Sequence, residues 1–246
     1  MTAVGYQALR QSCALWQRPP MRGVMLAGED RLRLLNGLVT CEVKSLVPGQ
    51  GTLGFFTDVK GHILSPVVVR AVDELLWLEL PAQAVEPMAE HIQKYIVADR
   101  VEVSVSQEAS PLTLIGPAAP AVVARIEGQS EPALSMWGSI EVEIGAASIV
   151  LSSGQELGVP ALTFWAPPPD RVAISEALGR AAGPDGLAAV EDSSVEVLRV
   201  EEGAPRFGAD YGAENLPQET GLEEAVSFSK GCYLGQEVVA RLQHRG

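Results

Sequence analysis

The sequence predicts an α+β protein built as two related layers, in which helices cover mostly antiparallel sheets. Hydrophobic residues make up 47% and charged residues 20%, as in ordinary globular chains. Both halves run through the same order of strand, helix, antiparallel strands, helix and strand. With 246 residues there is room for one large domain or two small ones. We expect a first layer over 1–107, a second over 108–184, and a segment over 185–246 that returns to the first.

In the first half, an acidic turn and the spacing of apolar residues predict the positions of helices and strands. Glu29 and Asp30 suit the N-terminus of a helix. Val85, Met88 and Ile92 follow helical spacing and predict a second helix. The expected strands cover 22–26, 52–56, 63–71, 74–80 and 101–105, and a tight hairpin-like loop over 58–61 joins two of them.

The second half repeats this plan without obvious residue identity. Short helices are expected over 121–126 and after Asp170, which can cap a helix that ends near Gly183. Strands are expected at 112–115, 140–144, 147–151 and 162–165. The two halves together therefore favour two related α+β layers.

Charge and cysteine content exclude several classes of protein. The formal net charge is −13 and the pI about 4.7, which argues against direct binding of nucleic acid or anionic lipid. No apolar run approaches the roughly 18 residues of a membrane helix, and the N-terminus lacks an export signal. The three cysteines are far apart and no Cys/His spacing resembles a metal site. We therefore expect a cytoplasmic protein without a structural metal.

An acidic stretch covers residues 185–224. It holds eleven carboxylates against Arg199 and Arg206. The simplest interpretation is a solvated acidic face. The alternative is that some of these carboxylates line a pocket for a cationic or hydrogen-bond-donating ligand.

The most unusual segment is Ser229-Lys230-Gly231-Cys232-Tyr233-Leu234-Gly235-Gln236-Glu237, followed by Arg241. The two glycines permit backbone conformations and close approaches that other residues forbid. A neighbouring ammonium stabilises a thiolate, so Lys230 would raise the reactivity of Cys232. The alternative is that Cys232 is a small buried hydrophobic residue.

This segment resembles the K-G-C-[FY]-x-G-Q-E signature of the YgfZ family, which is similar to the aminomethyltransferase of glycine cleavage. Further segments resemble the same family in order: 26–43, Asp58 to His62, Lys94-Tyr95, 199–205 and 215–219. The resemblance implies an aminomethyltransferase-like N-terminal fold whose second layer is ferredoxin-like. It also implies a folate-binding accessory protein for iron–sulfur enzymes, including those of tRNA modification. Relatives continue into a small C-terminal β-barrel, which we expect to be absent because the chain stops at Gly246.

The resemblance also implies a site for tetrahydrofolate or a derivative. Glu201 matches the residue that accepts hydrogen bonds from the pterin ring; its alternative is an exposed acid at a strand end. Arg199 would orient Glu201 or lie on the surface. The other residues expected at the folate, from the loop and the signature segment, are Asp58, Lys60, Tyr233, Gln236, Glu237 and Arg241. Lys230, Gly231, Cys232 and Gly235 complete the motif. Expected partners are folate and iron–sulfur client or assembly proteins, with no nucleic acid and no membrane.

This sequence departs from the family at the catalytic acidic pair and at the tryptophans that contact folate. The acidic pair of the aminomethyltransferases aligns with Ser65-Pro66, so that mechanism lacks its carboxylate. Tryptophans that contact folate in some relatives align with Met21 and Val195, and Trp16, Trp77, Trp137 or Trp165 could replace them only by geometry. The alternatives are a glycine-cleavage-type aminomethyltransferase using tetrahydrofolate, a module whose acidic segment docks a basic partner, and a thiol redox protein using Cys232.

Overall fold

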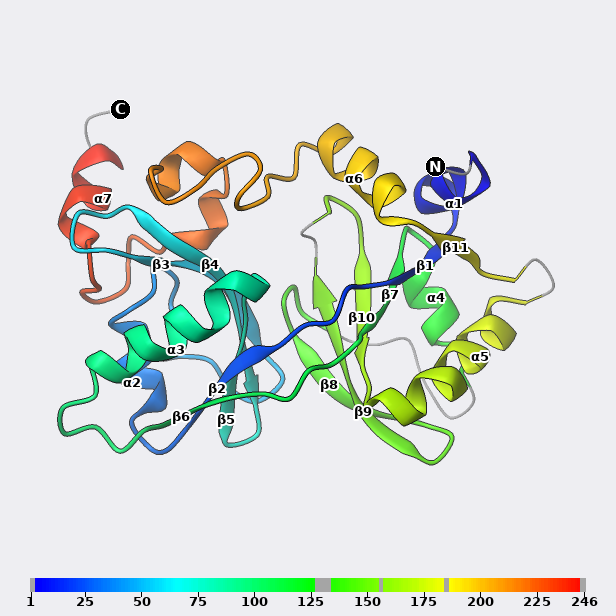
Figure 1. Ribbon diagram of the computed structural model, residues 1–246, viewed down its shortest axis with the longest axis horizontal. Helices are drawn as coiled ribbons and strands as arrows, with labels where there is room; N and C mark the ends of the chain where they lie inside the picture. The colour runs from blue at the N-terminus through cyan, green and yellow to red at the C-terminus, as the bar shows by residue number, and fades with distance from the viewer. Residues whose placement is uncertain (1–2, 127–133, 155–156, 184–185, 244–246) are drawn as a thin grey trace. The chain divides into compact units, whose positions relative to one another are not determined.

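The computed structural model describes residues 3–126, 134–154, 157–183 and 186–243. The chain forms two compact units (Figure 1). Unit 1 comprises Met1–Met21 and Glu108–Ala204, and unit 2 comprises Arg22–Gln107 and Pro205–Gly246. The predicted ranges grouped residues 1–21 with 22–107, whereas these residues add a helix and a strand to unit 1. The predicted boundary at 184 and 185 lies outside the described residues.

Unit 1 is a mixed sheet with two pairs of helices. The sheet order is β11-β1-β7-β10-β9-β8; β1 is parallel to β11 and the other neighbours are antiparallel. Its strands are β1 (Ala14–Gln17), β7 (Leu112–Ile115), β8 (Ser139–Ile144), β9 (Ala147–Gly154), β10 (Ala161–Trp165) and β11 (Ala188–Val190). Its helices are α1 (Ala3–Gln11), α4 (Ala119–Val123), α5 (Arg171–Ala182) and α6 (Asp192–Glu201), with a 3₁₀ turn at Pro168–Asp170.

Alternating strand residues divide the core of unit 1 between the two faces of its sheet. Leu114 packs with α4 and α5 in one cluster, while the next residue, Ile115, packs with α1 and α6 in another. Because successive strand residues point to opposite faces, the two helix pairs cover opposite sides of the sheet. The helix predicted after Asp170 begins at Arg171, although the Asp170 side chain makes no capping hydrogen bond.

Unit 2 is a fully antiparallel sheet of order β3-β4-β5-β2-β6. Its strands are β2 (Gly23–Ala27), β3 (Gly51–Thr57), β4 (Ile63–Val72), β5 (Leu75–Glu79) and β6 (Glu102–Val105). Its helices are α2 (Arg31–Asn36), α3 (Val85–Lys94) and α7 (Gln236–Gln243), with 3₁₀ turns at Ala82–Ala84, Pro217–Thr220 and Glu223–Ala225. The predicted α+β class with mostly antiparallel sheets is confirmed.

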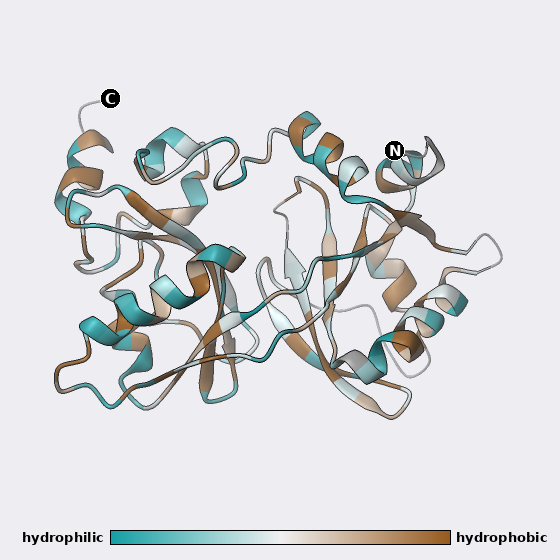
Figure 2. Ribbon diagram, in the orientation of Figure 1, coloured by the Kyte–Doolittle hydropathy of each residue, from teal (hydrophilic) through white to brown (hydrophobic). Residues whose placement is uncertain are grey.

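The two faces of the unit 2 sheet are covered by different parts of the chain. Phe56 packs with α2 and α3 in the main core, where Ile92 of α3 is fully buried. Figure 2 shows hydrophobic and hydrophilic residues together on α3, as expected for a helix that covers a sheet. The adjacent Phe55 instead meets Tyr211 edge to face, with ring centroids 6.1 Å apart. The returning segment over 205–243 therefore covers the second face.

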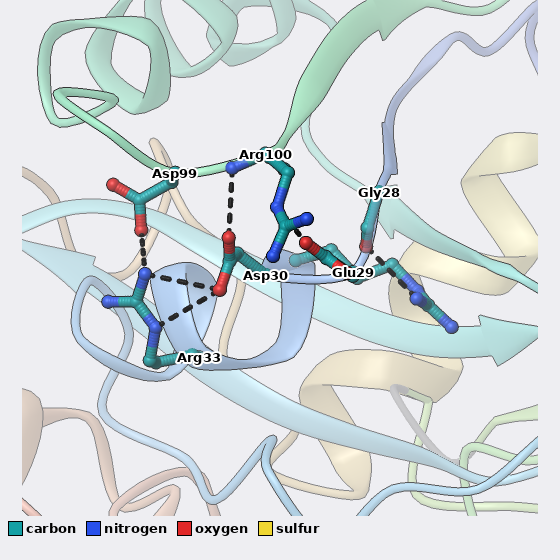
Figure 3. A network of polar contacts seen from close by, with 7 residues as sticks. Gly28, Glu29, Asp30, Arg33, Asp99 and Arg100 are labelled. Atoms are coloured by element: carbon teal, nitrogen blue, oxygen red, sulfur yellow. Dashed lines mark hydrogen bonds and ion pairs between the residues drawn. The ribbon is translucent and has the colours of Figure 1, made fainter.

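A polar network ties the loop before β6 to the start of α2 (Figure 3). The Asp30 carboxylate accepts a hydrogen bond from the Arg100 amide at 2.9 Å, and Arg33 pairs with both Asp30 and Asp99. Gly28 has a φ of +104°, and a Cβ there would lie 2.1 Å from the Arg100 carbonyl oxygen. Only glycine permits this close approach. The acidic turn predicted as a helix start therefore also holds the loop before β6 in place.

Among the residues that the structure describes, none belongs to a helix long and apolar enough to cross a membrane.

Candidate functional site

The loop over 229–235, called the Cys232 loop below, is bound to the rest of unit 2 on both sides of its cysteine, through Lys230 before it and Leu234 after it. Leu234 donates its amide to the Gly37 carbonyl at 3.0 Å and accepts from the Thr57 hydroxyl at 2.6 Å. These contacts join the loop to the end of α2 and the end of β3. Between the bound positions, Cys232 is exposed. The loop is therefore a fixed support for one accessible thiol.

Lys230 lies in the protein interior. Its side chain is buried, and its Nζ donates to the carbonyl oxygens of Asn36, Val39 and Cys41 at 2.7, 2.7 and 2.5 Å. The ammonium also lies 5.2 Å from the centroid of the Tyr233 ring. Burial lowers the pKa of Lys230 to about 8, and burial raises the pKa of the Tyr233 phenol to about 12.

The β3–β4 loop, Asp58 to His62, packs directly against the Cys232 loop. The Asp58 carboxylate accepts the amides of Lys60 at 2.8 Å and His62 at 2.9 Å, so it holds the turn in shape. A Cβ on Gly235, whose φ is +82°, would lie 2.4 Å from the Asp58 carbonyl oxygen and 2.9 Å from the Cα of Gly61. The structure thus brings together two segments that the sequence singled out separately.

Helix α7 follows the Cys232 loop and packs beside the same turn (Figure 1). The Gln236 side-chain oxygen accepts the Tyr233 amide at 3.2 Å. Glu237 and Arg241 form an exposed ion pair at 2.5 Å, one helical turn apart. Of the expected folate contacts in unit 2, Lys60, Glu237 and Arg241 present charge to solvent, whereas Tyr233 is buried.

Arg199 and Glu201 lie in unit 1, near the end of α6. Arg199 is buried and donates to Glu196 at 2.6 and 3.0 Å and to the Ala204 carbonyl at 2.6 Å. Residues two apart on a helix do not face each other, which disfavours the expected orientation of Glu201 by Arg199. Glu201 stands at the end of a helix; the alternative interpretation had placed it at a strand end.

Two residues of α1 hold Glu201 in place. Its carboxylate accepts hydrogen bonds from the Tyr6 hydroxyl and from Arg10 Nη2, the latter at 2.6 Å, while Arg10 Nη1 pairs with Glu202. The Tyr6 and Arg10 hydrogen bonds lower the pKa of the Glu201 carboxyl. With 45% of its side chain exposed, Glu201 stays ionised and open to a donor from outside. No sequence pattern other than their one-turn spacing pointed to Tyr6 or Arg10.

The tryptophans differ in how they are placed. Trp137 and Trp165 are buried, and Trp165 donates to the Ser152 hydroxyl at 2.8 Å. Trp16 in β1 is half-buried and donates to Asp192 at 2.7 Å. Val195, which aligns with a folate-contacting tryptophan of relatives, packs inside the core of unit 1. In the described ranges, no group of three His, Cys, Asp or Glu residues could hold a metal ion.

Comparison with known proteins agrees with this architecture. The family model described as the GCVT N-terminal domain matches residues 2–230. The tRNA-modifying protein YgfZ of Colwellia psychrerythraea is 28% identical over 225 residues, which cover 91% of this chain and 65% of the relative. Its counterpart from Vibrio vulnificus is also 28% identical, over 228 residues that cover 91% of this chain and 64% of the relative. The chain thus spans slightly less than two thirds of these relatives.

A solved structure shows the same fold. The glycine cleavage system aminomethyltransferase T from Bartonella henselae superposes with a TM-score of 0.84 at 18% identity, over 99% of this chain and 66% of that one. At that identity the likeness concerns the fold alone. The resemblance to the YgfZ family, first seen in the Cys232 segment, is confirmed over nearly the whole chain.

Proposed function

Because the chain belongs to the GCVT N-terminal domain family, we propose that it is a folate-binding accessory protein in the maturation or repair of iron–sulfur enzymes, including those of tRNA modification. The observation that carries the proposal is the joining of the β3–β4 loop and the Cys232 loop through Gly61 and Gly235. Both loops carry family motifs, and their contact places an exposed lysine and an exposed thiol on adjoining loops of one unit. The relatives named as tRNA-modifying proteins support the process.

Glu201 supports the folate part of the proposal. A pterin ring offers adjacent N–H donors, which an ionised carboxylate accepts as a pair. Glu201 is ionised, partly exposed and held by Tyr6 and Arg10, so its orientation is set before a ligand arrives. Tetrahydrofolate or a derivative is accordingly the proposed ligand, with Glu201 as its pterin-binding carboxylate.

Calorimetric titration of the full chain with tetrahydrofolate under anaerobic conditions tests this part. We expect a saturable heat that weakens at least tenfold in Glu201→Ala, about 1.4 kcal/mol or more of binding free energy. Glu202→Ala is the matched control, because Glu202 also pairs with Arg10 but has no proposed ligand contact. No saturable heat from the unmodified protein, or equal weakening by both variants, would contradict the role of Glu201.

The accessory role has its own test in cells that lack a YgfZ relative. Expression of the chain should restore the activity of iron–sulfur enzymes, and Cys232→Ala should restore it less well because the exposed thiol is gone. Full restoration by Cys232→Ala would show that the accessory role does not need the thiol.

Aminomethyl transfer is the less supported function. The position of the expected carboxylate holds Ser65, whose buried hydroxyl donates to the Pro66 carbonyl at 2.8 Å within β4. Neither residue supplies a carboxylate. Formation of methylenetetrahydrofolate from an aminomethylated lipoyl carrier would restore this alternative.

A further inference from the structure

Lys230 and Cys232 are two residues apart, yet their side chains have opposite surroundings. The Lys230 ammonium is buried against backbone carbonyls, whereas the Cys232 thiol is exposed. A lysine that activates a cysteine by charge should direct its ammonium toward the sulfur. Here the ammonium donates its hydrogen bonds to three backbone carbonyl oxygens instead.

The three carbonyl oxygens that accept from Lys230, called the seat below, form a site suited to a cation. The carbonyl of Asn36 belongs to the last residue of α2, and those of Val39 and Cys41 belong to the turn that follows. Carbonyls at the C-terminal end of a helix lack intrahelical partners and carry partial negative charge. An ammonium has three donors and no acceptor, so three carbonyls at 2.5–2.7 Å satisfy it completely.

Few other charges act on the seat. Glu42 and Lys44, in the turn just after it, influence Lys230 in opposite directions. The Cys41 thiol beside it stays neutral, since burial raises its pKa to about 12. Tyr233 likewise stays neutral and contributes the face of its ring. The positive charge is therefore held by carbonyl dipoles and an aromatic ring.

We propose that Lys230 is a positioning residue whose ammonium, seated on the carbonyls of Asn36, Val39 and Cys41, fixes the loop that presents Cys232, without activating that thiol by its charge. Lys230 fixes the loop on the N-terminal side of Cys232. Leu234 fixes it on the C-terminal side through its hydrogen bonds to Gly37 and Thr57. The inference rests on the proposed function only in taking Cys232 as the functional group that is positioned.

Lysine ammonium NMR of the unmodified chain tests the seat without any substitution. The chain has four lysines, and Lys44, Lys60 and Lys94 are exposed. Near neutral pH we expect one ammonium signal that exchanges slowly with water, because three hydrogen bonds protect it. Fast exchange of all four signals would overturn the inference.

Lys230→Met tests the positioning role, with Lys94→Met as the matched control at an exposed site of the same unit. Tyr233 is buried, so chymotrypsin should cleave after it severalfold faster in Lys230→Met and at the unmodified rate in Lys94→Met. The pH at which Cys232 alkylation reaches half of its plateau rate should be equal in all three proteins. A shift of that pH upward in Lys230→Met alone would show charge activation and overturn the inference.

None of these measurements uses folate. Failure of folate binding and failure of the positioning role are therefore separate outcomes. If Lys230→Met does not fold, the ammonium spectrum of the unmodified chain decides.

Discussion

Replacing Gly235 by alanine should disrupt the junction between the β3–β4 loop and the Cys232 loop. The residue has a φ of +82°, which costs alanine about 1–2 kcal/mol. The added Cβ would also lie 2.4 Å from the Asp58 carbonyl oxygen and within 3.0 Å of the Gly61 backbone. Backbone cannot rotate away as a side chain can, so overpacking adds about 1–3 kcal/mol. The free energy of unfolding should therefore fall by about 2–5 kcal/mol.

Urea denaturation of three alanine variants separates the two causes. Gly208 has the same φ of +82° but open space around its Cβ position, so Gly208→Ala should lose only the backbone cost of about 1–2 kcal/mol. Gly231 has open space and lies outside the left-handed region, so Gly231→Ala should stay within about 1 kcal/mol of the unmodified chain. A Gly235→Ala midpoint equal to that of Gly208→Ala would refute the packing argument.

Three further measurements test the cysteine thiols, the buried Thr40 hydroxyl and the half-buried His91 imidazole. In the native chain only the exposed Cys232 should react quickly with a thiol reagent, because burial raises the pKa of Cys41 to about 12; unfolding should expose all three thiols. Thr40→Val should lower the unfolding free energy by about 1–3 kcal/mol in urea titration, because the buried Thr40 hydroxyl accepts the Phe55 amide at 2.8 Å. Burial, with help from Lys94, lowers the pKa of His91, so the unfolded chain binds more protons below about pH 6.5. Stability should fall as the pH drops through that value, and a pH series of melts should show a shallower fall in His91→Phe.

Local patterns predicted much of the fold. Short apolar runs predicted most strands of both sheets, alternation of Val101, Val103 and Val105 predicted β6, and the spacing of Val85, Met88 and Ile92 predicted α3. Helix α1 and strand β1 were not predicted. Strand β1 is only four residues long, and its partners in β7 and β11 lie 95–101 and 174 residues away in the chain. Helix α6 lies in the acidic stretch, where charge obscured its apolar face of Val195 and Leu198.

The candidate site was predictable as motifs but not as contacts. The Cys232 segment and the β3–β4 loop stood out by composition, whereas their meeting at Gly61 and Gly235 depends on the tertiary fold. Lys230 shows most clearly that contacts could not be predicted from the sequence. Sequence proximity suggested an interaction with Cys232, but the loop turns the ammonium toward carbonyls 189–194 residues earlier in the chain.

The parallel pairing of β1 with β11 has a consequence for synthesis on the ribosome. All five strands of unit 2 have been made by residue 105, so that sheet can assemble while the chain is still growing. Strand β1 precedes the other described strands in the chain, but its neighbours β7 and β11 end at residues 115 and 190. Strand β1 can therefore pair with β7 once residue 115 has been made, but its other edge stays unpaired until β11 is complete at residue 190. A bulky N-terminal fusion should accordingly slow the completion of unit 1 more than that of unit 2.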